Sequence, residues 1–266
     1  MLESNKRLLC SMFIYSNLLV VAFDIPPVFG IVQDLEIPLL AEEALWNAPT
    51  AEAWRTLRDA RPPAPPQTIR NVMAEMLTGE NGDFPGQCAI SGFTALMTIH
   101  AVNILAWNLS QFSQLPILLS MDSCGNAAHA LLSNTLKTLA RCQDVLRRAK
   151  PEGIESLWST SEGALLLNCE AMLRVAYTRI FLNVHLPERL VLLFSTSRTK
   201  SDLLKRFVAS EQYRDPVVTK IMANMCDAFS VPFKAGYLLV QKTAAISWSV
   251  EHAMAGWGCG RFLALY

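Results

Sequence analysis

The residues that most often carry out chemistry are few in this sequence, and their spacing brings hardly any of them together. The four histidines are His100, His129, His185 and His252. No pair among them has the spacing that puts two metal ligands on one helical face. Glu251 and His252 are adjacent, so on a helix they point about 100° apart, and His252 is expected to hydrogen-bond within a helical bundle. Glu170 and Arg174 share a helical face, which favours an ordinary ion pair over a catalytic acid.

The common catalytic and phosphate-binding motifs are absent. The sequence has no Gly-x-Ser-x-Gly and no Gly-x-x-x-x-Gly-Lys. The glycine-rich run 256–260 follows a predicted helix rather than a strand, which favours close helix packing over phosphate binding. The aspartates stand alone and form no magnesium-binding cluster. The sequence therefore assigns no catalytic, cofactor-binding or metal-ligating residue and calls for no cofactor. It favours a protein that is not an enzyme, without deciding the matter.

Tryptophans and one basic helix end give the remaining signals. Trp46 and Trp54 are eight residues apart, and Trp248 and Trp257 are nine apart, bracketing a run of small residues. We interpret both pairs as core anchors, with a hydrophobic ligand pocket as the sharper alternative. The basic end near residues 141–150 is expected to complement a helix dipole.

Composition excludes several classes of protein. The chain has 266 residues, with 23 Lys plus Arg against 23 Asp plus Glu; 17% of residues are charged and 52% are apolar. Intrinsic disorder requires few apolar residues and a high net charge, so this chain is expected to fold. A free-standing nucleic-acid binder normally carries a basic excess, which is missing here.

The seven cysteines are widely spaced, and no two lie closer than the 18 residues between Cys124 and Cys142. Most sit in apolar runs, which is typical of reduced, buried thiols in the cytosol or nucleus and excludes the short-range pairs of a zinc finger. Residues 8–23 carry no charge, but polar residues interrupt them and they are shorter than the roughly 20 residues of a membrane span. We expect a buried helix there rather than a targeting segment.

Helical signals dominate the chain, and the fold class we predict is all-α, an irregular multi-helix bundle. The expected helices are 5–23, 42–47, a helix capped by Thr50 and running to Asp59, 68–78, 87–111, 125–150, 161–182, 216–229, 232–241 and 244–264. Residues 26–40 are expected to form an extended connector, 150–153 a helix stop and 195–200 a mobile loop. We treat 1–266 as one domain, with a candidate internal break at the proline-rich linker 61–66.

Residues 84–121 are the most unusual stretch, because 38 consecutive positions lack Asp, Glu, Lys and Arg. Polar uncharged residues recur through it at helical intervals, and Pro116 is expected to break its second part. We predict a central helix that other segments or a partner cover on most sides.

Four separated blocks resemble the regulatory (middle homology) domain of fungal-specific transcription factors. They are the segment ending in Asp24-Ile25-Pro26-Pro27, the segment around Ala44-Leu45-Trp46-Asn47-Ala48, the helix with Glu170 to Arg174 and Ala176-Tyr177-Thr178-Arg179, and the closing Val231-Pro232-Phe233-Lys234-Ala235-Gly236 with Trp248-Ser249-Val250-Glu251-His252-Ala253. The chain is most similar to the branch whose DNA-binding part is a pair of two-cysteine, two-histidine zinc fingers. The resemblance implies a helical, nuclear protein that regulates transcription.

The departures from the family pattern shape the expected function. The zinc module is missing from the sequence, and the N-terminal part of the regulatory domain is expected to be missing as well. The resemblance therefore implies a truncated regulator that acts through protein contacts, with a full-length related transcription factor as a candidate partner. It implies a pathway-specific role in secondary metabolism or nutrient use. Neither autonomous DNA binding nor association with a membrane is expected. The alternatives are a small-molecule binder or biosynthetic enzyme, for which Glu251 with His252 or Glu170 with Arg174 would supply the polar pair, and a cytoplasmic rather than nuclear location.

Overall fold

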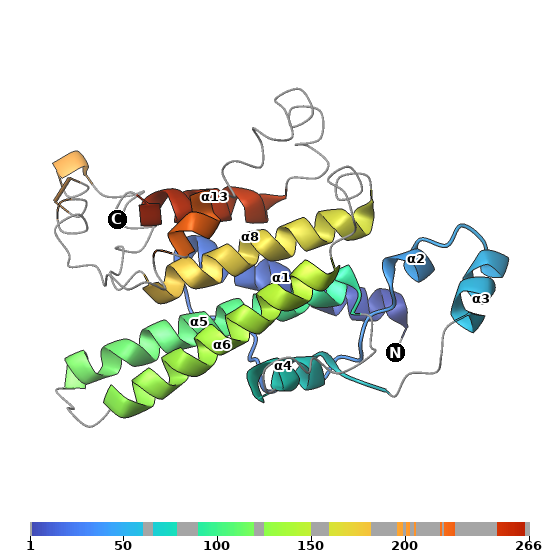
Figure 1. Cartoon of the computed structure of the whole chain (residues 1–266), viewed down its shortest axis with the longest axis horizontal. Helices are drawn as coiled ribbons and strands as arrows, with labels where there is room; N and C mark the ends of the chain where they lie inside the picture. The colour runs from blue at the N-terminus through green and yellow to red at the C-terminus, as the bar shows by residue number, and fades with distance from the viewer. Residues whose placement is uncertain are drawn as a thin grey trace.

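The computed structural model describes residues 2–60, 66–78, 90–119, 125–149, 160–181, 196–198, 201–202, 205, 219, 221–226 and 249–263. The helices are α1 (Glu3–Phe23), α2 (Glu43–Trp46), α3 (Ala51–Asp59), α4 (Ile69–Thr78), α5 (Gly92–Leu119), α6 (Gly125–Ala149), α8 (Ser161–Phe181) and α13 (Val250–Leu263). Within these ranges the one β-type contact is an isolated bridge between Pro38 and Thr68. The predicted all-α bundle is confirmed (Figure 1).

Helix α5 lies at the centre of the bundle, as the uncharged stretch predicted. It packs against α8, α1, α6 and α4 (Figure 1). Its polar side chains find partners inside: Thr98 donates to the Thr94 carbonyl, and Asn103 Nδ2 donates to the carbonyl oxygens of Ile99 and of Met172 on α8, both at 3.0 Å. The helix starts at Gly92 and continues through Pro116 to Leu119, so the expected break at that proline is wrong.

Among the described residues, two helices, α1 and α5, are long and apolar enough to cross a membrane. In α5, 78% of the apolar window is buried inside the protein, which is the pattern of a core helix. In α1 the buried share is 39%. The prediction of a buried helix therefore holds for one face of α1, which contributes Cys10, Phe13 and Asn17 to the interior, while the opposite face exposes Leu8 and Tyr15. Apolar residues nearly all round a helix do not tell which face its neighbours cover.

Helix α1 ends where the sequence indicated. Asp24 has the left-handed conformation, with φ 56°, and its N–H donates to the Val20 carbonyl at 2.9 Å. An αL residue of this kind closes many helices, and Pro26 and Pro27 follow directly. Downstream, the connector pairs with the start of α4, because the N–H groups of Ile69 and Arg70 donate to the carbonyls of Ile37 and Leu35. The expected connector is confirmed in its extended part, with a turn at residues 31–35.

Helices α2 and α3 form an arm at the edge of the molecule, on the side of the N-terminus (Figure 1). The predicted cap is present, because Thr50 Oγ1 accepts from the Ala53 N–H at 3.1 Å. No residue of α3 is buried.

Helix α13 packs along α8 and also touches α1 (Figure 1). It begins at Val250, and the expected residues 244–248 lie outside the described ones. The expected stop at 150–153 and the helix 232–241 lie there too, as do residues 61–65 of the linker, half of the loop 195–200 and half of the helix 216–229. Of the expected loop, residues 196–198 are described, and 197 and 198 are helical. Of the helix 216–229, residues 219 and 221–226 are described and are helical.

Candidate functional site

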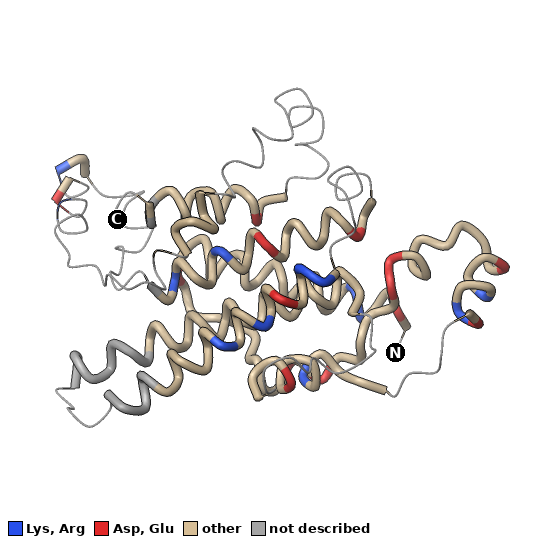
Figure 2. The backbone as a smooth tube through the Cα atoms, viewed as in Figure 1, with Lys and Arg blue, Asp and Glu red and all other residues tan. Residues whose placement is uncertain are grey.

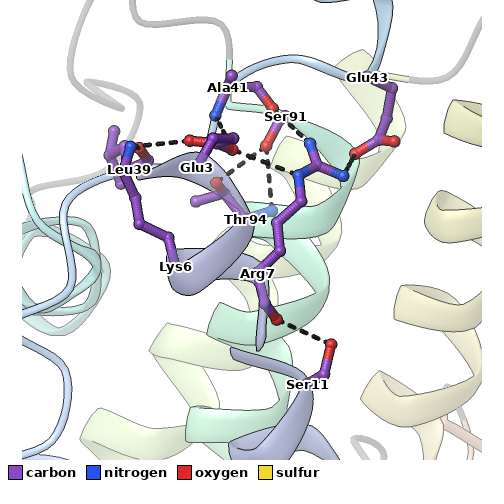
Figure 3. Close-up of polar contacts among 9 residues, drawn as sticks. All are labelled: Glu3, Lys6, Arg7, Ser11, Leu39, Ala41, Glu43, Ser91 and Thr94. Atoms are coloured by element: carbon purple, nitrogen blue, oxygen red, sulfur yellow. Dashed lines mark hydrogen bonds and ion pairs between the residues drawn. The ribbon is translucent and has the colours of Figure 1, made fainter. Parts of the chain in front are cut away.

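Arg7 on α1 organises a polar junction at the N-terminal ends of several helices (Figure 3). Its guanidinium contacts Glu3 Oε1 at 3.3 Å, the Ala41 carbonyl at 2.9 Å and Glu43 Oε1 at 2.9 Å. Glu3 in turn accepts from the Ala41 N–H at 2.9 Å and pairs with Lys6 at 2.9 Å. Only 11% of the Arg7 side chain is exposed, so this charge depends on its partners.

The same guanidinium also lies over aromatic rings. It is 4.5 Å from the ring centre of Trp46 on α2 and 5.3 Å from that of Phe93 on α5. A cation over a ring face is attracted by the ring quadrupole. Arg7 therefore fastens the segment carrying Trp46 to α1, while Trp46 keeps 45% of its surface exposed.

A cavity of about 560 Å³ lies beside this junction. It is lined by Glu42, Glu43, Ala44, Asn47, Ile90, Ser91, Thr160, Ser161 and Glu162. Two helices begin at its wall. Ser91 Oγ accepts from the Thr94 N–H at the start of α5, and Thr160 Oγ1 accepts from the Gly163 N–H at the start of α8. The volume is within the usual range of small-ligand pockets.

Carboxylates dominate the electrostatics of this cavity. The carboxylate of Glu162 accepts from the Gly92 N–H, so it supplies negative charge to the first turn of α5, which has no acidic residue of its own. Burial raises the pKa of Glu162, and the nearby carboxylates of Glu43 and Glu42 raise it as well. At Glu3, burial alone would raise the pKa, but the bonds from Lys6, Ala41 and Arg7 outweigh it and hold the pKa below its usual value. A cation that entered the cavity would relieve the repulsion around Glu162.

A second polar cluster is buried where α1, α5 and α13 meet. Asn17 Nδ2 lies 2.7 Å from His100 Nδ1, and His100 Nε2 lies 3.8 Å from Glu251 Oε1. Asn17 and His100 are fully buried and Glu251 is 5% exposed. The amide NH₂ can only donate, so Nδ1 accepts and the proton of the neutral ring is on Nε2, facing Glu251. Burial lowers the pKa of His100.

Glu251 remains ionised within this cluster. Burial would raise its pKa, but the nearby imidazole of His100 and hydroxyl of Ser249 outweigh that and hold the pKa at about 2. Ser249 also contacts Asn168 Oδ1 on α8 at 2.9 Å. The N-terminal end of α13 is therefore fixed by polar contacts to α5 and α8.

A third contact joins α8 to the end of α1. Arg179 Nη2 lies 3.0 Å from Asp24 Oδ1 and 3.3 Å from the Val20 carbonyl oxygen. It binds both the acid that ends α1 and one of that helix's last carbonyls. The cation complements the C-terminal end of the α1 dipole.

The residues singled out in the sequence take up varied positions. Glu170 and Arg174 form the expected ion pair, at 3.5 Å. Glu251 and His252 point apart as expected: Glu251 faces His100, and His252 is half-buried, with its pKa lowered by burial and by Arg174. Neither pair lines the cavity.

Three of the four tryptophans singled out in the sequence are described, and they fit the core-anchor interpretation poorly. Trp46 and Trp54 are 45% and 40% exposed, and Trp257 is 57% exposed, while Trp248 lies outside the described residues. An indole covers much surface even when half of it faces water, so tryptophan type alone does not place a residue in the core.

The glycine run and the basic helix end also differ from expectation. A methyl group added at Gly258 would lie 3.4 Å from Thr178 Oγ1, whereas Gly256 and Gly260 have nothing within 4 Å. Only Gly258 therefore matches the expected close packing. Arg147 pairs with Asp144 in the last part of α6, but Arg141 reaches across to the Met76 carbonyl near the end of α4.

Sequence reasoning missed the residues that join the helices, namely Arg7, Asn17 and His100. Arg7 carried a faint signal as a charge at the edge of an apolar run. Asn17 and His100 carried none, because their partners are 83 or more residues away in the chain. Among the described residues, no three His, Cys, Asp or Glu side chains come together in a group able to hold a metal ion.

Comparison with known proteins finds similarity over parts of the chain. A stretch of 109 residues, 41% of this chain, is 30% identical to the zinc finger protein klf1 of Schizosaccharomyces pombe, and it spans 13% of that relative's length. No solved structure matches the chain. Residues 189–266, which include α13 with Glu251, match the model of the fungal transcription factor C-terminal domain.

Proposed function

We propose that the chain is a regulatory part of a transcription-factor-like protein, acting through contacts with other proteins rather than with DNA. The observation that carries this proposal is the match of residues 189–266 to the fungal transcription factor C-terminal domain. The similarity to a zinc finger protein supports the same role.

The contacts among the family-like blocks add support. Arg7 and Glu43 join the first block to the second, Arg179 and Asp24 join the third to the first, and Glu251 on the fourth faces His100. These blocks therefore pack together in one bundle, as expected if a single regulatory unit holds all of them.

Finer features of the proposal rest on the resemblance. They are a nuclear location, kinship with the two-cysteine, two-histidine zinc-finger branch, a related transcription factor as partner, and a pathway-specific role in secondary metabolism or nutrient use. The alternative is a small-molecule binder or biosynthetic enzyme; neither polar pair considered for it, Glu170 with Arg174 or Glu251 with His252, lines the cavity found among the described residues.

A tethering experiment tests the regulatory role. The full chain is fused to a bacterial DNA-binding domain in a fungal host that carries a reporter with the matching operator. We expect reporter transcription to differ from that with the DNA-binding domain alone, and not to differ on a reporter without the operator. Equal transcription in both cases, with a folded fusion protein present in the nucleus, would contradict the proposal.

A second experiment tests the expected lack of autonomous DNA binding. The untagged chain is incubated with a pool of random-sequence duplexes, and bound duplexes are selected and sequenced over several rounds. We expect no sequence to be enriched, because the net formal charge is zero and offers no excess of cations for phosphates. Enrichment of one sequence motif would contradict the expected lack of DNA binding.

A further inference from the structure

Helix α3 is an amphipathic element that packs against α2 and buries none of its own residues within the described part of the chain. It has nine residues, none of them buried, and lies at the edge of the molecule against α2 (Figure 1). Isolated helices shorter than about 12 residues are marginal in water and depend on packing of an apolar face. Trp54, 40% exposed, stands at the centre of such a face.

The charges of α3 are distributed unevenly around Trp54. At 100° per residue, Leu57 and Ala53 flank the indole on one side, and Arg58 and Arg55 on the other. The acidic residues Glu52 and Asp59 fall on the far side of the helix. Arg58 stacks over the Trp54 ring at 4.9 Å, and its ion pair with Asp59 is largely exposed. Exposed pairs are worth little, so this one opposes rearrangement only weakly.

The cavity beside Arg7 has the complementary character. Ala44 and Ile90 give it an apolar wall, and the carboxylates of Glu42 and Glu162 give it negative charge, while the carboxylate of Glu43 is already paired with Arg7. At about 560 Å³ it has room for an indole ring. Burial raises the pKa of Glu162 most, and an incoming guanidinium would relieve the additional repulsion from the carboxylates of Glu43 and Glu42.

We propose that α3 of one chain docks into this cavity of a second copy, with Trp54 entering the cavity and Arg55 and Arg58 facing its carboxylates. Cavity and helix are neighbours in sequence, because Ala44 and Asn47 on and beside α2 line the cavity and α3 starts at Ala51. Figure 2 shows acidic residues at the start of α2 and both basic and acidic residues on α3. A two-fold axis that places one α3 over the other copy's cavity also places the second α3 over the first cavity. Such an interface is self-complementary, as closed dimers require.

Sedimentation of the full chain over a wide concentration range tests the proposal. We expect a reversible monomer–dimer equilibrium. Trp54→Ala and, from the cavity side, Ala44→Arg should each weaken dimerisation about tenfold or more, since buried tryptophans are frequent hot spots. Trp257→Ala is the matched control, because it removes another exposed tryptophan from α13 and should leave the equilibrium unchanged.

Mixing the two variants separates this mode of docking from any other. The Ala44→Arg chain keeps an intact α3 and the Trp54→Ala chain keeps an intact cavity, so a mixed pair has one intact junction and either pure pair has none. We expect the mixture to associate more strongly than each variant alone, with far-ultraviolet circular dichroism confirming that both chains are folded. A monomeric wild type, a dimer indifferent to Trp54→Ala, or a mixture no stronger than its parts would overturn the proposal. Self-association through α3 does not depend on the regulatory role.

Discussion

Three charged side chains, Arg7, Arg179 and Glu251, are largely withdrawn from water and join segments far apart in the sequence. An unpaired charge at such a site is costly, so each has partners: carboxylates and a carbonyl for the two arginines, and His100 with Ser249 for the glutamate. Removing one member leaves the other buried and unpaired, which costs more than the pair itself contributes. Single substitutions at these positions should therefore be more harmful than those at exposed ion pairs.

The carboxylate of Glu251 makes stability depend on pH. Its pKa in the folded protein is about 2, below its usual 4.5, so its contribution is present above pH 4.5 and is lost as pH falls towards 2. We expect Glu251→Gln to lower the free energy of unfolding at neutral pH by about 1 to 3 kcal/mol. Urea unfolding at a series of pH values should show that the variant loses less stability than the wild type between pH 4.5 and 2.

Glu170→Gln is the control for this titration, because Glu170 belongs to a partly buried ion pair within one helix and lies outside the cluster around His100. It should change stability by less than about 0.5 kcal/mol. His100 adds to acid sensitivity in both proteins: burial lowers its pKa, so stability is lost as pH falls below 6.5. A parallel pH dependence of wild type and Glu251→Gln would contradict the assignment of Glu251.

The contact between Arg179 and Asp24 can be measured with a double-mutant cycle. Arg179→Met keeps the length of the side chain but removes the bonds to Asp24 and to the Val20 carbonyl, and we expect a cost of about 1 to 3 kcal/mol. Asp24→Asn keeps a residue that tolerates φ 56° and removes only the charge. The coupling energy should be about 0.5 kcal/mol or more; additive effects would mean that the two side chains do not act together.

The end of α1 and the start of α3 were predictable because local signals mark them, whereas α5 was expected over 87–111 and spans Gly92–Leu119. Thr50 caps α3, and Asp24 with two following prolines closes α1, so nearest-neighbour chemistry was sufficient. Pro116 misled the prediction, because a proline only weakens a helix and the surrounding segment is otherwise strongly helical. Which face of α1 is exposed could not be predicted, since apolar residues on all sides of a helix do not show which side faces solvent.

The three glycines of α13 differ in what surrounds them, and this predicts that alanine stabilises the protein to different extents at the three positions. Gly256 and Gly260 have open space around the position of a Cβ, so Gly256→Ala and Gly260→Ala should each raise the free energy of unfolding by about 0.5 to 1 kcal/mol. Gly258→Ala would put a methyl group against Thr178 Oγ1 at 3.4 Å and should gain less. Thermal unfolding of the three variants checks the order, and equal effects would contradict it.

The cap of α3 should matter for that helix alone. Thr50→Ala removes the bond to the Ala53 N–H, at a cost of about 1 kcal/mol, but α3 buries no residue in the bundle. Hydrogen exchange should therefore become faster in residues 51–59 while the global unfolding midpoint of the monomer stays unchanged. Thr56→Ala is the control, because its hydroxyl bonds back to the Glu52 carbonyl within the helix rather than capping it.

At the scale of the molecule, the fold class followed from the sequence, but the site did not. Helical periodicity and an uncharged central stretch were sufficient to predict a bundle around α5, because burial on all sides requires an uncharged helix. The cavity is formed by side chains from three parts of the chain, residues 42–47, 90–91 and 160–162. None of these is unusual in its own neighbourhood, so no local pattern could have indicated that they meet.

The prediction that 1–266 forms one domain can be tested by removing the segment that matches the family model. Helix α13 belongs to that segment, yet it packs on α8. The N-terminal end of α13 is held by Ser249, which contacts α8, and by Glu251, which faces α5. We expect a chain of residues 1–188 to expose apolar surface of α8, to bind the dye ANS and to lose cooperative unfolding, because buried positions such as Ala255 and Cys259 would no longer cover the bundle. Adding residues 189–266 as a separate polypeptide should reduce dye binding if the two parts make one core. If instead 1–188 unfolds cooperatively at the midpoint of the full chain, the matched segment is an independent module and the single-domain prediction is wrong.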